Sequence, residues 1–211
     1  MNSAIATYCS VLPGLDSFFR SLSVADVDSC VVVESAFPEV ERCSEEKFRY
    51  RLSHTPELCV GLFIKDGGHD RLIGHVIGNR VSGGRITEGS MSMPENWQTL
   101  ARNAAFKVDG EVIGNDPNGA SIAIHSVAIS PEYQGKGVGK ALVAAYIQYI
   151  KDAQVLADCI MLIAHDYLIR FYESTGFKNC GSSHCQFAGG GWSMIFEVTE
   201  GIALATKNMR R

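Results

Sequence analysis

Residues 127–140 read VAISPEYQGKGVGK, and this stretch carries the strongest structural signal in the chain. An apolar strand ends at its start, a turn follows, and a helix begins inside the run of glycines. Three glycines at alternate positions let the backbone approach a ligand closely and direct successive N–H groups at one point. That point lies at the positive end of the helix, which favours phosphate oxygens, and Lys136 and Lys140 add charge nearby. The stretch predicts a phosphate-binding turn or, if no ligand is involved, a plain glycine-rich turn.

Two common phosphate motifs are absent from this stretch. A Walker A loop needs GxxxxGK[ST] and a dinucleotide fingerprint needs GxGxxG, whereas the run here is Gln134-x-x-Gly137-x-Gly139. The flanking residues extend the pattern. Residues 120–129, ASIAIHSVAI, read as a strongly apolar strand, and residues 138–150 repeat apolar side chains at helical spacing. We therefore expect a strand, a binding turn and an amphipathic helix in succession.

The rest of the chain alternates predicted helices and strands. Capping residues and prolines indicate helices over 26–37 and 44–55, and a hairpin turned by DGGHD joins strands at 58–64 and 72–77. A strand at 159–164, a short helix at 166–174 and two strands at 177–186 and 192–198 complete the pattern. Residues 81–119 read as an insertion, with a helix expected around 97–107. We predict a mixed α/β fold in a single domain spanning residues 1–211.

Composition narrows the classes of protein. The 211 residues are 46% hydrophobic and 20% charged, which is ordinary for a globular chain and argues against a disordered or repeat-built one. The net charge of −4 gives no basic surface for nucleic acid or for an acidic membrane. No apolar stretch reaches the ~18 residues that a membrane span needs, and the first residues do not resemble a signal peptide. We expect a cytoplasmic monomer without nucleic-acid or membrane partners.

The cysteines indicate neither disulfides nor a metal site. There are seven, an odd number, and they form no CxxC pair and no zinc-ligand spacing. Reduced and mostly buried thiols fit a cytosolic protein. No cysteine has a histidine at the spacing of a known thiol nucleophile, so covalent catalysis is not favoured.

Further blocks give the glycine run a family context. The run resembles the acyl-CoA pyrophosphate loop of the GCN5-related N-acetyltransferase (GNAT) superfamily, and HDYLIRFYESTGF, residues 165–177, resembles its next block. Three further segments, PEL at 56–58, ITEGS at 86–90 and IHSVAI at 124–129, resemble the arylalkylamine (serotonin) N-acetyltransferases. The likeness extends over about 24–198. The long insertion and the sequence FPE at 37–39 are similar to the fungal branch, which also acetylates polyamines.

This resemblance implies a fold and a cosubstrate. The fold is the α/β acyl-CoA N-acyltransferase fold, a mixed and mostly antiparallel sheet flanked by helices. The cosubstrate is acetyl-CoA, with no metal, and the acetyl group passes directly to an amine in a ternary complex. The residues that the resemblance assigns to the cosubstrate are Val127, Ala128, Ile129, Gln134, Gly135, Lys136, Gly137, Val138, Gly139, Lys140 and Tyr172.

The resemblance also implies two catalytic residues. An alkylamine arrives protonated, because its pKa is near lysine's ~10.4, and histidine with a pKa of ~6.5 suits the removal of that proton. Animal members carry two histidines on this strand, at the positions of Ala123 and His125, so His125 is the single candidate base here. Tyr172 is the expected acid that protonates the leaving thiolate, while the N–H of Val127 stabilises the carbonyl oxygen. The structural alternatives are a satisfied strand histidine and a core tyrosine.

The expected acceptor site lies after the first helix. The resemblance places Phe37, Pro38 and Glu39 over an aryl ring and an ammonium group, and Glu88 is a further acid candidate. An exposed loop with no ligand is the alternative. The remaining histidines, His54, His69, His75, His165 and His184, are expected to be structural or surface groups.

We therefore expect an N-acetyltransferase that acts on small arylalkylamines such as serotonin, tryptamine and phenylethylamine, on polyamines, or on both. One alternative is a protein acetyltransferase that modifies lysine or an N-terminus, which would need an open groove. A second alternative is a non-catalytic sensor of acyl-CoA, which would keep the glycine run but need neither His125 nor Tyr172.

Overall fold

One mixed sheet organises the chain. The structure is a computed structural model that describes residue 12 and residues 14–198. Within these residues, seven strands form a sheet in the order β1-β2-β3-β6-β7-β9-β8. All neighbours are antiparallel except β6 and β7, which are parallel. The strands are β1 (Ser17–Ser21), β2 (Cys59–Asp66), β3 (His69–Val81), β6 (Ser121–Ile129), β7 (Cys159–Ala164), β8 (Lys178–Ser182) and β9 (Ser193–Val198).

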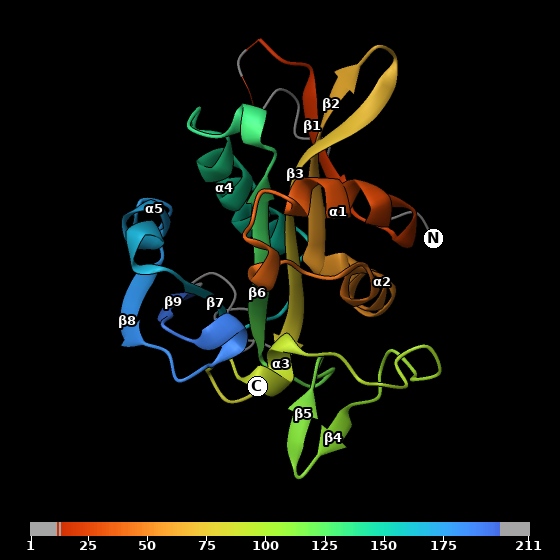
Figure 1. The fold of residues 1–211 in the computed structure, drawn as a ribbon, viewed down its shortest axis with the longest axis vertical. Helices are drawn as coiled ribbons and strands as arrows, with labels where there is room; N and C mark the ends of the chain where they lie inside the picture. The colour runs from red at the N-terminus through yellow and green to blue at the C-terminus, as the bar shows by residue number, and fades with distance from the viewer. Residues whose placement is uncertain (1–11, 13, 199–211) are drawn as a thin grey trace.

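Helices cover both faces of the sheet. In Figure 1, α1 (Val27–Glu34) and α2 (Glu45–His54) lie on one side, and α4 (Val138–Asp152) and α5 (Ile169–Glu173) lie on the other. Each side has its own apolar core. The α4 core contains Leu142, Tyr146 and Ile150 with side chains from the central strands, whereas α1 and α2 pack through a separate cluster. The sheet therefore separates two cores, which confirms the predicted α/β class.

Local signals explain where the helices begin and end. Ser44 caps α2 by accepting a hydrogen bond from the N–H of Lys47, and the helix ends before Pro56. Gly137, with φ of 80°, caps α4, as the glycine run predicts. The first helix is shorter than the expected 26–37, because α1 ends at Glu34 and residues 35–37 form a turn. Strand β1 has no counterpart among the sequence predictions.

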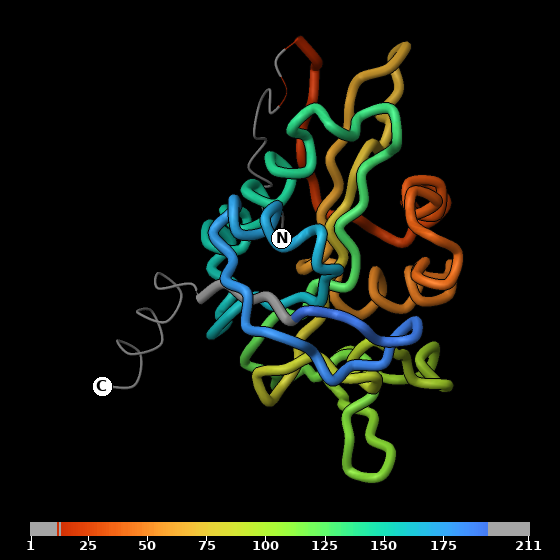
Figure 2. The backbone as a smooth tube through the Cα atoms, turned by 60° about the vertical axis from the view of Figure 1, so that its left-hand side comes forward, coloured from red at the N-terminus to blue at the C-terminus, as the bar shows by residue number. Residues whose placement is uncertain are grey.

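The insertion differs from its prediction. The helix expected at 97–107 is wrong: residues 95–99 form turns, and β4 (Phe106–Val108) pairs with β5 (Glu111–Ile113). Asp109 and Gly110 both have positive φ, 48° and 84°, which is the geometry of a two-residue hairpin turn. This Asp-Gly turn directs residues 106–113 into the hairpin that projects at the lower end of the molecule in Figure 2. A short helix, α3 (Glu88–Met91), joins β3 to this region.

We predict that the α4 core carries much of the stability. Leu142 is fully buried, and its replacement by alanine leaves a cavity. Leu142→Ala should lower the free energy of unfolding by about 3 kcal/mol in a urea titration. Gln148→Ala on the exposed side of the same helix is the control and should change the value by less than about 0.5 kcal/mol. Equal losses for the two variants would contradict the assignment of this face to the core.

Candidate active site

The site lies where β6 and β7 separate. Their parallel pairing ends at Ile124 and Leu162, and beyond this point the two strands line opposite walls of a cavity. The cavity is narrow, with a volume of about 70 Å³. Residues 126–129 of β6 pair with β3 on one side but not with β7 on the other. The β7-facing edge of this segment is therefore available to an extended ligand that pairs as an added strand.

A β-bulge places two consecutive polar side chains on the same wall. In the β3–β6 ladder, Ser126 is opposite Ile77 and Ile124 is opposite Gly78, so His125 is the extra residue. The bulge interrupts the alternation of the strand. As a result, the side chains of His125 and Ser126 both interact on the side of the sheet that carries α1 and α2.

The contacts of His125 define its basic atom. Its Nε2 lies 2.6 Å from Oδ1 of Asn79, an acceptor, so Nε2 carries the proton. Its Nδ1 lies 3.0 Å from the sulfur of Met91. Burial, followed by the charges of Arg51 and Lys47, holds the pKa of His125 well below its usual value. The imidazole is therefore neutral near pH 7, with its lone pair on Nδ1.

A buried carboxylate lines the same cavity and contacts Ser126. Glu34, at the end of α1, is 2% exposed and lines the cavity together with Ser126. Its Oε2 accepts hydrogen bonds from Oγ of Ser126 at 2.7 Å and from Nε2 of His75 at 3.0 Å, and its Oε1 accepts one from the N–H of Cys43 at 2.8 Å. Burial raises the pKa of Glu34, but the bonds from His75, Cys43 and Ser126 outweigh it, so the pKa is lowered. Glu34 is thus held as a carboxylate.

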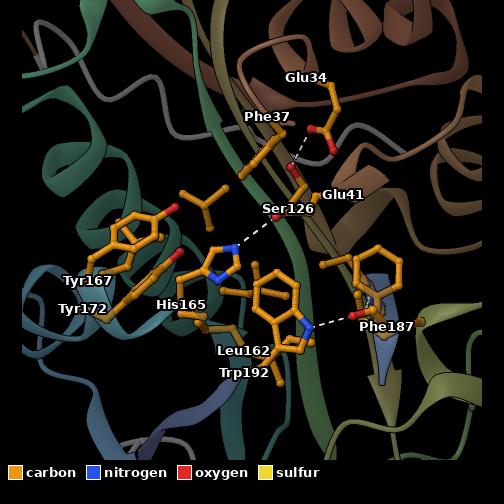
Figure 3. A pocket seen from close by; sticks show the side chains of 17 residues that line it. Glu34, Phe37, Glu41, Ser126, Leu162, His165, Tyr167, Tyr172, Phe187 and Trp192 are labelled. Carbon is orange, nitrogen blue, oxygen red and sulfur yellow. Dashed lines mark hydrogen bonds and ion pairs between the residues drawn. The ribbon is translucent and has the colours of Figure 1, made fainter. Parts of the chain in front are cut away.

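Aromatic rings and a second acidic group line the outer part of the cavity. Figure 3 shows His165, at the end of β7, between the rings of Tyr167 and Trp192. Its Nε2 lies 3.1 Å from Oε1 of Glu41, which belongs to the loop between α1 and α2. This contact joins the loop to β7 across the cavity. The aromatic side chains that line the cavity are Phe37, Tyr167, Tyr172, Phe187 and Trp192.

Tyr172 occupies the inner wall formed by α5. It is 7% exposed, lines the cavity, and packs edge-on against Phe171 and Phe177. Burial raises the pKa of its hydroxyl. The phenol is therefore neutral at physiological pH, and it is a hydrogen-bond donor rather than a phenolate base.

The glycine run has the geometry of an anion-binding turn. Gly135 and Gly137 have φ of 70° and 80°, a region that other residues rarely adopt. The N–H groups in the first turn of α4 have no acceptor within the helix, so they point outward from its N-terminus. A Cβ at Gly139 would lie 3.4 Å from the ring of Phe171, which brings the run next to α5. The run, α5 and the free edge of β6 thus adjoin one another, as a CoA site would require.

Comparisons with known proteins agree with this geometry. A family model described as an acetyltransferase (GNAT) domain matches residues 93–192. The GphF GNAT-like decarboxylase in complex with isobutyryl-CoA superposes with a TM-score of 0.61 at 13% identity, covering 85% of this chain and 98% of that one. The PaiA N-acetyltransferase of Thermoplasma acidophilum in complex with coenzyme A gives a TM-score of 0.54 at 17% identity, covering 87% and 99%.

This protein has the GNAT fold. An uncharacterized N-acetyltransferase, ycf52, of Pyropia yezoensis is 32% identical over 76 residues, which are 36% of this chain. The matched part spans 42% of that relative's length. The family match and the fold support the GNAT superfamily, and the solved GNAT structures named above contain coenzyme A or an acyl-CoA.

The GNAT fold brings some predicted site residues together and leaves others apart. His125, Val127, Tyr172 and Phe37 line the cavity. Ala128 and Ile129 follow on β6 with their side chains in the two cores, so only their backbone faces the open edge. Residues 134–140 lie at the N-terminus of α4.

Three predicted acceptor residues lie outside this cavity. Pro38 and Glu39 are exposed, and the acidic lining from their loop is Glu41 instead. Glu88 lies on α3 and lines a different cavity with Glu111 and Asp116, where its carboxylate accepts the N–H of Gln186 at 2.7 Å. Glu88 therefore lies in a different cavity from His125 and Tyr172, the two predicted catalytic residues.

Several lining residues were missed by the sequence analysis. Glu34, Ser126 and the supporting His75 are polar residues inside apolar runs, and such interruptions are the signal that could have found them. His165 directly follows a buried strand, at the end of β7 that faces the cavity. Trp192 and Phe187 come from a glycine-rich segment whose path the sequence does not define.

The described residues contain neither a metal-binding cluster nor a membrane-spanning helix. Residues 12 and 14–198 contain no group of three or more metal-ligating side chains in metal-binding geometry. No helix in this part of the chain has the length and apolarity to cross a membrane.

We predict that Glu34 makes stability depend on pH. Its pKa is lowered from about 4.5 on folding, so its contribution is complete above that value and is lost as pH falls through the folded pKa. Glu34→Gln should lower the free energy of unfolding at pH 7 by about 2 kcal/mol, because charge-assisted bonds are lost. The difference from the wild type should shrink below pH 4.5. Urea titrations at several pH values measure it, and a constant difference down to pH 3 would contradict an ionised Glu34.

Proposed function

We propose that this protein is an acetyl-CoA-dependent N-acetyltransferase whose acceptors are the primary amines of small arylalkylamines, polyamines or both. The observation that carries the proposal is the composition of the cavity between β6 and β7. One side of the cavity has an unpaired strand edge and a tyrosine. The other side has two carboxylates, Glu34 and Glu41, and several aromatic rings. Carboxylates and aromatic faces attract an ammonium group. The whole-protein activity is our inference, because the matched relative is covered over less than half of its length.

The chain's donors fit a CoA cosubstrate. The N–H groups at the start of α4 suit a pyrophosphate, with Lys136 and Lys140 on the same exposed turn. The unpaired edge of β6 at Val127–Ile129 suits the amide groups of a pantetheine arm. When bound, acetyl-CoA supplies the thioester whose acetyl group moves to the amine. We assign the N–H of Val127, which lies next to the bulge, as the donor that stabilises the thioester carbonyl oxygen.

The acceptor side fits a small amine better than a protein chain. The contact between Glu41 and His165 connects the α1–α2 loop to β7 across the cavity, so the groove over β6 is bridged. A lysine side chain in a protein or an N-terminus would need this bridge to open. The narrow aromatic cavity instead suits an aryl or alkyl amine whose ammonium group approaches Glu34 and Ser126.

His125 is our candidate for the group that takes the amine proton. The lowered pKa keeps its imidazole neutral, and the bond from Nε2 to Asn79 leaves Nδ1 as the proton acceptor. Tyr172 stays protonated because its pKa is raised, so its O–H is available to donate to the departing sulfur. No covalent intermediate with the enzyme is required, because the amine attacks the thioester carbonyl directly and the thiolate leaves, with His125 and Tyr172 both in the wall of the cavity.

The activity is tested by two measurements on the same protein. Calorimetry should detect CoA binding, and thiol release from acetyl-CoA should require a small primary amine. Gly137→Val should weaken CoA binding by about tenfold or more, because valine disfavours the positive φ of residue 137. Gly84→Ala, at a positive φ in a turn remote from the cavity, is the control for a strained loop. Binding without thiol release would indicate an acyl-CoA sensor, and release only with peptides would indicate a protein acetyltransferase.

We predict that His125→Ala lowers kcat/KM by about 10²-fold at pH 7, which is typical of the loss of a general base. The loss should shrink as pH rises, because a larger fraction of the amine is then already deprotonated. Because the pKa of His125 is lowered, protonation of this histidine should reduce the wild-type kcat/KM only below pH 6.5. The titration of the amine itself affects the pH profile separately. His184→Ala on the exposed part of the chain is the control. Identical pH profiles for the wild type and His125→Ala would remove His125 as the base.

A further inference from the structure

A second, basic compartment adjoins the active-site cavity on the α2 side of His125. We name it the basic compartment, and it is lined by Arg42, Cys43, Lys47 and Arg51 together with Glu41, Met91, His125 and Phe187. The last four residues also line the main cavity. A group that entered the basic compartment would therefore lie next to His125, the proposed base.

The guanidinium of Arg51 is buried without a carboxylate partner. Arg51 is 2% exposed, and its Nη2 donates to the carbonyl of Met91 at 3.1 Å. Its Nη1 lies 3.1 Å from the sulfur of Cys43, and its Nε has no partner among the described residues. Burial raises the pKa of Cys43 to about 11, so this sulfur is a neutral thiol and not a counter-ion. A buried charge with an N–H group that lacks a hydrogen-bond acceptor is unfavourable unless an anion pairs with it.

Two further cations line the same compartment. Lys47 lies 5.5 Å above the ring of Phe187, and burial and the neighbouring Arg51 lower its pKa. The side chain of Arg42 donates to the backbone carbonyls of Phe37 and Ser35. Among the ion pairs of the described residues, none includes these three cations. The lining contains one acid, Glu41, against these three cations, so positive charge is in excess.

We propose that the basic compartment binds a small oxyanion of carboxylate size, placed beside the acceptor amine. The inference rests on the proposed function and refines it. The compartment has a volume of about 10 Å³, so one oxygen atom of a carboxylate can enter it while the rest of the group stays in the adjoining main cavity. A nucleotide or a large phosphate ester is excluded. The oxyanion is either a carboxylate on the acceptor itself, which reaches in from the main cavity, or a free anion that accompanies a plain amine.

Matched substrates and variants distinguish these sources. The substrates are an amine and the same amine with an α-carboxylate, such as tryptamine and tryptophan, and plain amines are also assayed with added acetate at constant ionic strength. The variant is Lys47→Gln. Its matched control is Arg49→Gln, which removes the same charge from the exposed side of α2, where Arg49 pairs with Glu45. Binding is measured independently of activity, as the rise in melting temperature on addition of acetate.

One of two results supports the proposal. If the acceptor supplies the carboxylate, wild type and Arg49→Gln should prefer the carboxylated member in kcat/KM by about tenfold, and Lys47→Gln should lose this preference through KM. If a free anion is bound, acetate should stimulate plain amines and raise the melting temperature in wild type and Arg49→Gln but much less in Lys47→Gln.

Equal responses of all three proteins to acetate, together with no preference for carboxylated acceptors, would overturn the basic compartment as an anion site. A failure of the proposed function looks different. In that case no amine would release thiol from acetyl-CoA, while the acetate-induced rise in melting temperature would still separate Lys47→Gln from Arg49→Gln.

Discussion

The separation of two parallel strands is the constraint on which the rest of the site depends. β6 and β7 pair over only three residue positions and then diverge, although both continue to the same end of the sheet. Unpaired backbone in the interior of a protein is unfavourable unless another group satisfies it. The divergence therefore creates both a cavity and a row of N–H and C=O groups that a bound chain-like ligand can satisfy. The glycine run and α5 contribute to the same location because each directly follows one of these two strands.

The bulge at His125 converts this opening into a polar site. Regular alternation would send either His125 or Ser126 toward the α4 core, where an imidazole or hydroxyl would lack partners. The extra residue instead directs both side chains toward α1 and α2, whose buried charges are of opposite sign. Glu34 at the end of α1 faces Ser126, whereas Arg51 and Lys47 of α2 act on His125. The negative side suits an ammonium group, and the positive side keeps the histidine neutral.

The sequence alone predicted the elements that local rules define. The helical repeat of α4, the glycine run and the polar cap of α2 were all readable, and His125 and Tyr172 were placed on the elements that line the cavity. Residues whose role depends on register and tertiary contacts were not readable. Glu34 becomes a site residue only because α1 packs over the bulge, and Glu41 only because its loop reaches β7. The hairpin of the insertion, by contrast, was signalled locally by Asp109 and Gly110 and was overlooked.

The insertion takes part in the site, since it supplies the atom that faces the lone pair of His125. Thr87 and Ser90 cap α3 reciprocally, and this short helix ends at Met91, whose carbonyl is held by Arg51. Because Nε2 of His125 is committed to Asn79, a proton can be accepted only at Nδ1, 3.0 Å from the sulfur of Met91. A thioether is a flexible and weakly polar side chain. In the proposed mechanism, proton transfer to His125 requires the Met91 side chain to move aside for the amine or for a water, so α3 belongs to the proposed acceptor site.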